Sequence, residues 1–124
     1  MTRGSLLIAI FSVLALGLFV AVTASAYPNY SASPAPAASP IVVIIRDFAF
    51  KPSSLTVPVG TTVLWKNEDS AAHTATSLTG AWDSGNLDQG QSYTFKFTKA
   101  GTYDYVCNYH PNMRATITVK DSGQ

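Results

Sequence analysis

Three residues with metal-binding side chains lie close together near the C-terminal end of the chain. Cys107, His110 and Met113 follow one another at intervals of three residues, and a second histidine, His73, lies 34 residues before the cysteine. These are the only Cys and the only His residues of the chain, and Met113 is its only Met apart from Met1. A thiolate and two imidazoles form a trigonal ligand set, and a weak axial thioether completes the arrangement of blue-copper electron-transfer sites. The spacing therefore predicts a copper site with these four side chains as metal ligands.

Each of these residues also has an ordinary explanation. A lone Cys is usually a small buried apolar residue, a lone His is more often on the surface or satisfied in a core, and a Met more often packs than binds a metal. A catalytic Cys–His pair is the next interpretation, but the sequence shows no third group that would orient the histidine. Structural zinc is less favoured because a thioether is not one of its usual ligands. The coincidence of three rare residue types at one spacing favours copper.

The segments around these residues have the patterns of β-strands. Apolar residues recur in short runs or alternate with polar ones, and turn residues separate the segments. The segments expected as strands are residues 41–46, 48–50, 55–59, 61–65, 93–97, 103–107 and 116–120. About seven short strands without an amphipathic helix pattern predict an all-β sandwich or barrel. Cys107, His110 and Met113 would then lie in a loop between the last two strands, and Pro58 would mark an edge strand or a bulge.

The first 40 residues differ in composition from the rest. Residues 6–22 are an apolar run of 17 residues behind Arg3, and residues 24–26 form an Ala-Ser-Ala site that a signal peptidase could cut. Eleven of the fourteen residues in 27–40 are Pro, Ala or Ser, which is typical of an extended linker. We expect a signal peptide or membrane anchor over 1–26, a linker over 27–40 and a folded domain over 41–124. A cleaved periplasmic protein and one tethered through residues 5–23 at the extracytoplasmic face of the membrane both fit this pattern.

The folded part carries no net charge. Seven Lys or Arg residues and seven Asp or Glu residues follow residue 40. A neutral domain argues against binding to nucleic acid, which needs a basic surface to neutralise phosphates.

A single Cys excludes an intramolecular disulfide framework. A domain of this size buries a small core, which suits a binding module better than an enzyme with a deep substrate cleft.

Around the four predicted metal ligands, the sequence resembles the cupredoxins, specifically the small proteins of the plastocyanin and amicyanin type. The resemblance covers residues 41–120 and is carried by Phe50-x-Pro52-x-x-Leu55-x-Val57-x-x-Gly60, Trp65-x-Asn67-x-Asp69-x-x-x-His73, Asp83-Ser84-Gly85, Gly101-Thr102-Tyr103-x-Tyr105-x-Cys107 and His110-Pro111-x-Met113. It implies a Greek-key β-sandwich of about seven to eight strands, one copper ion, and single-electron shuttling between a larger protein donor and acceptor, without catalysis. The four predicted ligands match the family's ligands position by position. A copper chaperone or storage protein is the alternative, although such proteins typically hold Cu(I) through several Met or Cys side chains.

Two positions depart from the family's pattern. Thr74 stands where plastocyanin-like proteins often have an Asn whose side chain braces the copper loop, and Ala115 stands where many relatives have a Gly. The backbone N–H of Thr74 remains available to the Cys107 sulfur.

The solvent-facing edge of the site is expected at His110, which lies in the predicted loop beside Pro111. We expect His73 to be buried and fixed. We also expect the protein to be a monomer that docks only transiently with its redox partners. The apolar residues expected on the docking surface are Ala71, Ala72, Pro111 and Trp82.

Overall fold

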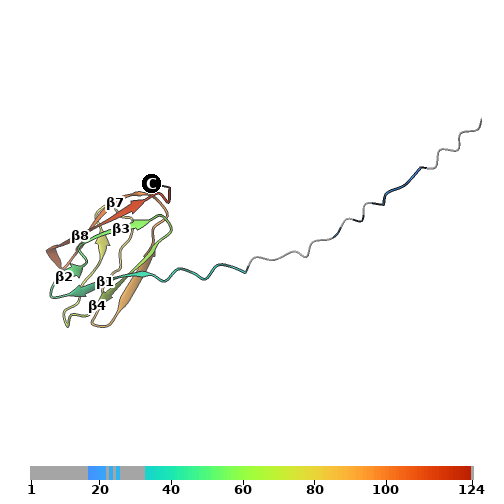
Figure 1. Ribbon diagram of the computed structural model, residues 1–124. Coiled ribbons are helices and arrows are strands. Elements are labelled where there is room, and N and C mark those ends of the chain that lie inside the picture. The colour runs from blue at the N-terminus through green and yellow to red at the C-terminus, as the bar shows by residue number, and fades with distance from the viewer. Residues whose placement is uncertain (1–16, 22, 24, 26–32, 124) are drawn as a thin grey trace, which may run out of the picture. The chain divides into compact units, whose positions relative to one another are not determined.

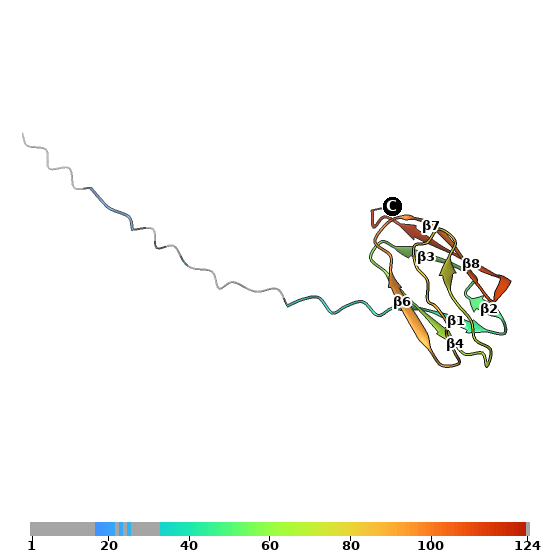
Figure 2. The same ribbon diagram turned by 180° about the vertical axis from the view of Figure 1, so that it is seen from behind.

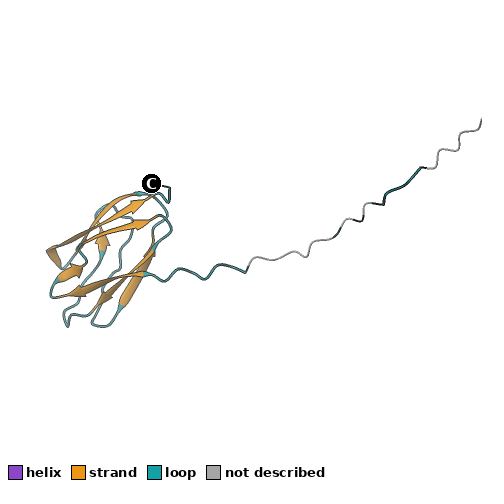
Figure 3. Ribbon diagram, viewed as in Figure 1, coloured by secondary structure: helices purple, strands orange, loops and turns teal. Residues whose placement is uncertain are grey.

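The computed structural model describes residues 17–21, 23, 25 and 33–123, and in this part of the chain it shows eight β-strands and no helix (Figures 1 and 3). The strands are β1 (Ile41–Arg46), β2 (Ala49–Lys51), β3 (Ser54–Pro58), β4 (Thr62–Asn67), β5 (Thr76–Ser77), β6 (Ser92–Lys96), β7 (Gly101–Cys107) and β8 (His110–Lys120). They form two four-stranded sheets, in the orders β2-β1-β4-β6 and β3-β8-β7-β5. Figure 2 shows β6 beside β4, at one edge of the first sheet. The all-β sandwich expected from the sequence is confirmed.

Both sheets mix parallel and antiparallel pairs. β1 pairs with β4 in parallel, and β3 pairs with β8 in parallel, whereas the remaining pairs are antiparallel. The chain passes from one sheet to the other five times between β2 and β7, so consecutive strands often lie in different sheets. β3 lies at the edge of its sheet, where the missing N–H of Pro58 costs no ladder hydrogen bond. The edge strand expected at this proline is confirmed.

Alternating inward side chains of both sheets build the core. On β4, Val63, Trp65 and Asn67 are fully buried, and on β8 the buried positions recur at every second residue from Met113 to Val119. Aromatic rings join the two sheets, because Trp65 of β4 meets Tyr105 of β7 edge to face with ring centroids 5.7 Å apart. This packed interior holds the ends of β7 and β8, where the predicted metal ligands lie.

Three expectations about the strands were wrong. Phe48, expected within a strand, lies in the two-residue turn between β1 and β2, where both Asp47 and Phe48 have positive φ. The last strand begins at His110 rather than at Thr116, so the two C-terminal ligands belong to β8 and not to a loop. The short strand β5 was not expected at all, because two residues carry no periodic pattern.

The chain divides into two units, residues 1–34 and 35–124, and the second holds all eight strands. Most of the segment expected to be a signal peptide or anchor, residues 1–26, lies outside the described residues. Among the residues whose placement is described, no helix is long and apolar enough to cross a membrane. The domain boundaries expected from the sequence stay predictions.

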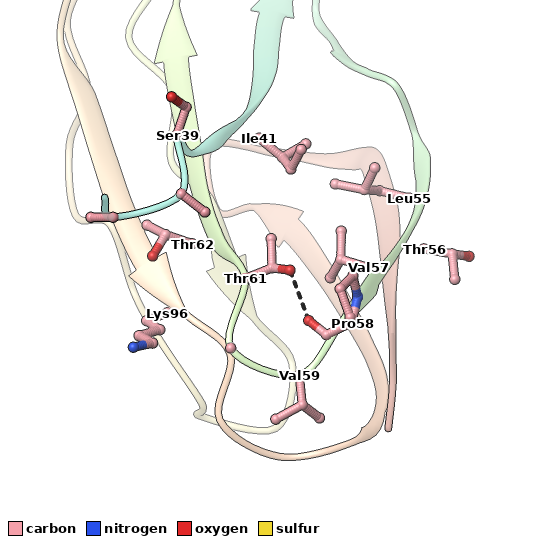
Figure 4. Close-up of a pocket in the computed structure, with 13 residues that line it drawn as sticks. Ser39, Ile41, Leu55, Thr56, Val57, Pro58, Val59, Thr61, Thr62 and Lys96 are labelled. Atoms are coloured by element: carbon pink, nitrogen blue, oxygen red, sulfur yellow. Dashed lines mark hydrogen bonds between the residues drawn. The ribbon is translucent and has the colours of Figure 1, made fainter. Parts of the chain in front are cut away.

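A pocket of about 560 Å³ opens beside β3 and the start of β4 (Figure 4). Its walls are mostly apolar, from Ile41, Leu55, Val57 and Val59, and Thr61 closes one side by donating a hydrogen bond to the Pro58 carbonyl. Val57 pairs with Val119 of β8, near the end of that strand opposite His110. None of the four predicted metal ligands lines this pocket.

Candidate metal centre

Cys107 and His110 face each other across the turn between β7 and β8. Cys107 is the last residue of β7 and His110 the first of β8, and the two form the final pair of the ladder. The register shifts between Val106 and Cys107, which marks a bulge in this hairpin. Bulges re-aim side chains near functional sites, and here the thiol of Cys107 is fully buried and faces both histidines. The hairpin therefore presents two predicted ligands at the paired strand ends on either side of a short turn.

The structure brings His73 to the same point from 34 residues upstream. The Nδ1 atoms of His73 and His110 each lie 3.6 Å from the Cys107 sulfur. The three possible donor atoms lie within 4.8 Å of one another, and the two imidazole centroids are 5.0 Å apart. Three of the four predicted ligands thus converge, each with a nitrogen or sulfur atom directed to one point.

The fourth predicted ligand, Met113, is buried within the same apolar cluster as Cys107. It lies on β8 three residues after His110, and only 3% of its surface is exposed. Ala115, which departs from the family's pattern, is the next inward residue of that strand and is also buried. A thioether at this place suits a weak axial ligand, and its role in metal binding stays a prediction.

Backbone hydrogen bonds hold His73 in place although it lies outside the long strands. Its N–H donates to the Leu87 carbonyl (3.1 Å), and the Leu87 N–H donates back to the His73 carbonyl (2.8 Å). The fully buried side chain of Asn67 supports the same loop by donating to the carbonyls of Ala71 and Leu87, both at 2.8 Å. The burial expected for His73 is confirmed, since its ring has no exposed surface.

Thr74 braces the turn between β7 and β8 with both its backbone and its side chain. Its N–H donates to the Cys107 sulfur at 3.3 Å, which confirms the bond expected from the sequence. Its hydroxyl oxygen accepts the N–H of Asn108 at 2.8 Å and a bond from the Thr76 hydroxyl at 3.0 Å. Thr74 therefore supplies the side-chain brace that its departure from the family's Asn had put in question.

Asp69 contacts the far side of the His73 ring. Its Oδ2 lies 2.9 Å from His73 Nε2, and its two carboxylate oxygens accept the backbone N–H groups of Asp47 (2.8 Å) and Phe48 (3.0 Å). Burial raises the pKa of Asp69, but the bonds from Phe48 and Asp47, followed by His73, outweigh it and leave the pKa below its ordinary value. Asp69 lies in a motif recognised from the sequence but had no predicted role, because a carboxylate four residues before a histidine does not reveal what it contacts.

His110 lies at the surface side of the site, half-buried between the interior and exposed neighbours. Pro111 and Tyr109 on either side are exposed, and Ala71 and Ala72 are half-buried. Trp82 was expected on this surface, and that was wrong. Its ring is 5% exposed and stacks on Trp65 in the core, with centroids 5.3 Å apart. Phe48, which is 54% exposed, takes a place on this face that sequence reasoning did not anticipate.

The donor set fits a copper ion better than the other common metals. One cysteine sulfur and two imidazole nitrogens converge, and among the described residues no carboxylate joins the group. Soft sulfur ligands suit Cu(I) and imidazoles suit Cu(II), whereas calcium and magnesium require oxygen ligands. The Cys107 sulfur is buried, and so is Met113, which disfavours the solvent-open position of a catalytic zinc site.

Comparisons with known proteins agree with this donor set. Residues 11–119 match the family described as the cupredoxin-like domain. The chain is 36% identical over 85 residues to amicyanin from Paracoccus denitrificans, covering 64% of this chain and 65% of that protein. It is 37% identical over 84 residues to plastocyanin from Scenedesmus fuscus, covering 57% of this chain and 86% of that protein. A solved amicyanin variant in its Cu(I) form superposes with a TM-score of 0.63 at 36% identity, covering 65% of this chain and 82% of that one.

Proposed function

The chain belongs to the cupredoxin-like family, and from this premise we propose that it is a blue copper protein that carries single electrons between larger redox proteins. The convergence of Cys107 Sγ with the Nδ1 atoms of His73 and His110 is the observation that carries the proposal. One copper ion would be held by these three side chains and by Met113. A copper ion bound there would supply a one-electron couple between Cu(I) and Cu(II).

The residues around the ligands favour a site that changes little between the two oxidation states. Cys107 and His110 lie at the ends of paired strands, and the N–H of Thr74 holds the sulfur from a third segment. His73 is fixed by backbone bonds on one side and by Asp69 on the other. Ligands held this rigidly need little rearrangement when an electron arrives or leaves.

His110 is the most exposed of the four predicted ligands, since the other three are buried. Its ring is half-buried and its neighbours Tyr109 and Pro111 are exposed. We infer that redox partners dock on this face, weakly and without strong electrostatic steering, because the charges of the folded part cancel.

Catalysis and copper storage fit the site less well. Four protein ligands leave no open position for a substrate, so the protein is proposed not to be an enzyme. A Cu(I) store or chaperone would be expected to hold several Met or Cys side chains, and this chain has one Cys and one Met besides Met1. The four ligands form a single mononuclear site.

We also propose that residues 1–26 direct the chain out of the cytoplasm and that 27–40 form a linker. The apolar run behind Arg3 and the Ala-Ser-Ala site support export, and the Pro, Ala and Ser content of 27–40 supports an extended spacer. Mass spectrometry of the protein isolated from membrane and soluble fractions would distinguish a cleaved form from a tethered one.

Titration of the purified protein with Cu(II) tests the function. A short copper–thiolate bond gives an intense visible band, and we expect this band to saturate at one equivalent of copper. Ascorbate should bleach the band and an oxidant should restore it, because the couple is reversible. A colourless copper complex, or two or more copper ions bound with similar affinity, would contradict the proposal.

A further inference from the structure

One carboxylate joins the buried histidine to the turn between β1 and β2. We propose that Asp69 is a positioning residue that fixes the ring of His73 and, through the same carboxylate, holds Phe48 against both imidazoles of the site. The inference deepens the proposed copper function and rests on it. It concerns a residue outside the ligand set, and three hydrogen bonds from three residues converge on it.

The contact with Asp69 determines which ring nitrogen of His73 carries the proton. An ionised carboxylate only accepts hydrogen bonds, so the 2.9 Å contact between Asp69 Oδ2 and His73 Nε2 places the ring proton on Nε2. The lone pair of Nδ1 is then free on the side that faces the Cys107 sulfur, 3.6 Å away. Asp69 thereby keeps His73 in the form that can bind a metal through Nδ1.

The same carboxylate supports the turn at residues 47 and 48. Asp47 and Phe48 have φ values of 55° and 53°, a left-handed conformation that non-glycine residues adopt at a cost of about 1–2 kcal/mol each. Two-residue hairpin turns of this kind usually contain Asn or Asp followed by Gly. Here Asp69 accepts both backbone N–H groups of the turn, at 2.8 Å and 3.0 Å. These bonds offset part of the conformational cost and hold the turn over the site.

The Phe48 ring of this turn contacts both imidazoles of the site. Its centroid lies 5.2 Å from that of His73 and 5.0 Å from that of His110, with interplanar angles of 85° and 89°. Both contacts are edge-to-face, a favourable arrangement for aromatic pairs. Asp69 thus acts on His73 directly and on His110 through Phe48.

Protein groups other than His73 also hold Asp69 in place. Its N–H donates to Asn67 Oδ1 at 3.0 Å, and Asn67 is fully buried at the end of β4. The Asp69 side chain is 12% exposed, so the packed fold rather than solvent determines its orientation. The carboxylate is therefore a fixed element of the site.

The charge of Asp69 should favour the oxidised state. A carboxylate that accepts the second ring N–H of a metal-bound histidine makes that imidazole a stronger donor, and removing such a partner typically costs about 10–100-fold in metal affinity. A stronger donor stabilises Cu(II) more than Cu(I). Each tenfold loss confined to Cu(II) corresponds to a rise of about 59 mV in the reduction potential.

The variant Asp69→Asn tests the proposal, and Glu68→Gln is its matched control. Glu68 is the adjacent carboxylate, and its side chain pairs with Arg46 and Lys66 rather than with His73. Both variants remove one negative charge at nearly the same place. We expect Asp69→Asn to raise the reduction potential and to weaken Cu(II) binding by at least tenfold relative to Glu68→Gln. Equal potentials and equal Cu(II) affinities in the two variants would overturn the proposal.

A measurement on metal-free protein separates this proposal from the copper function. Two-dimensional NMR of ¹⁵N-labelled protein at about pH 8, where ordinary imidazoles are neutral, reports which nitrogen of His73 carries the proton. We expect the Nε2–H form in the parent protein and in Glu68→Gln, and loss of that preference in Asp69→Asn. A Nδ1–H form in the parent protein would overturn the role of Asp69 whether or not copper binds. Absence of the thiolate band in the parent protein would instead contradict the copper function.

A second variant tests the contribution of the aromatic ring. Phe48→Leu removes the ring but keeps the bond between Asp69 and His73, so the His73 tautomer should not change. The ring protons of His110 should shift in the NMR spectrum because they lose the ring current of Phe48. In Asp69→Asn the same protons should shift toward their Phe48→Leu positions, and unchanged His110 shifts there would overturn the link through Phe48.

Discussion

Cys107 combines the burial of a core residue with the polar contacts of a ligand. Its side chain has no exposed surface, yet its sulfur lies within reach of two imidazoles and accepts a backbone N–H. An apolar packing role would require none of these contacts. The thiol is therefore the residue whose loss should separate metal chemistry from folding.

Replacing this residue by serine should remove the copper–thiolate chemistry and leave the β-sandwich. In Cys107→Ser we expect no intense visible band at any ratio of Cu(II), because the band requires a copper–sulfur bond. The far-ultraviolet circular dichroism of the metal-free variant should match that of the parent protein, since the serine oxygen can still accept the Thr74 N–H. An intense band that survives in the variant would show that another group binds the copper.

The brace between the His73 segment and the β7–β8 turn shows how two elements far apart in sequence fix one site. Thr74 donates its N–H to Cys107 and accepts the N–H of Asn108 with its hydroxyl. The Asn108 side chain in turn donates to the hydroxyl of Thr76, the first residue of β5, at 3.1 Å. The turn is thus tied to one neighbouring segment through both backbone and side-chain groups.

Removing the Thr74 hydroxyl tests this brace. Thr74→Val keeps the side-chain shape and the backbone N–H but leaves the Asn108 N–H without its acceptor. We expect the free energy of unfolding of metal-free protein to fall by about 1 kcal/mol, as for a typical intramolecular hydrogen bond. Thr94→Val, at an exposed position of β6, is the control and should change stability by less than this. Equal urea denaturation curves for the two variants would contradict the role of the hydroxyl.

The strands with clear alternation were predictable from sequence, whereas the contacts between segments were not. The expected strand at residues 41–46 matches β1, and alternation located β3, β4, β6 and β7 to within a few residues. The stretch between the expected strands 103–107 and 116–120 was predicted to be a loop, and it contains Asn108, Pro111 and Asn112, residue types that are common in turns. The structure pairs Arg114 with Val106 and His110 with Cys107, so pairing with β7 overrides the local preference.

At the site, residue type and spacing predicted which side chains converge but not what supports them. The structure brings together Cys107, His73 and His110, as the rarity of their residue types indicated. The contacts of Asp69 with the turn at residues 47 and 48 join segments 21 and 22 residues apart. No local pattern reports such contacts. Phe48 was expected in a strand because it alternates with Phe50, but it has a positive φ and donates its N–H to Asp69.

The predicted metal ligands join parts of the sandwich that are far apart along the chain. His73 follows β4 of one sheet, and Cys107 and His110 lie on β7 and β8 of the other. The core that supports them consists of apolar side chains from both sheets. Copper binding should therefore add stability to a domain that is already folded.

Comparison of metal-free and copper-loaded protein tests this expectation. A ligand that binds only the folded state stabilises it by about 4 kcal/mol when its free concentration is a thousandfold above Kd. We expect a higher melting temperature with copper, together with native-like circular dichroism and cooperative unfolding of the metal-free protein. An unfolded metal-free protein would show that the core is insufficient without the ligands. Equal melting temperatures would show that copper does not bind the folded state preferentially.

The buried Tyr105 should make the sandwich less stable as the pH rises into the alkaline range. It is 1% exposed, and its ring packs edge to face against Phe50 with centroids 4.6 Å apart and against Trp65 of the opposite sheet. Burial disfavours the charged phenolate and raises the pKa of Tyr105 to about 12, from 10.0. The folded protein therefore keeps this proton over a range of pH in which the unfolded chain has lost it.

The sign of the effect follows from where the proton is held. Below about pH 10 both states are protonated and the contribution of Tyr105 to stability is fully present. As the pH rises from about 10 to about 12, the unfolded state binds fewer protons, so the free energy of unfolding should fall by roughly 2–3 kcal/mol from this residue alone. Urea denaturation of metal-free protein across this range measures the slope. Tyr105→Phe should show a shallower fall than the parent protein, whereas Tyr109→Phe, at an exposed position, should keep the parent's slope. The same slope in Tyr105→Phe as in the parent would mean that the Tyr105 proton is not retained by the folded core.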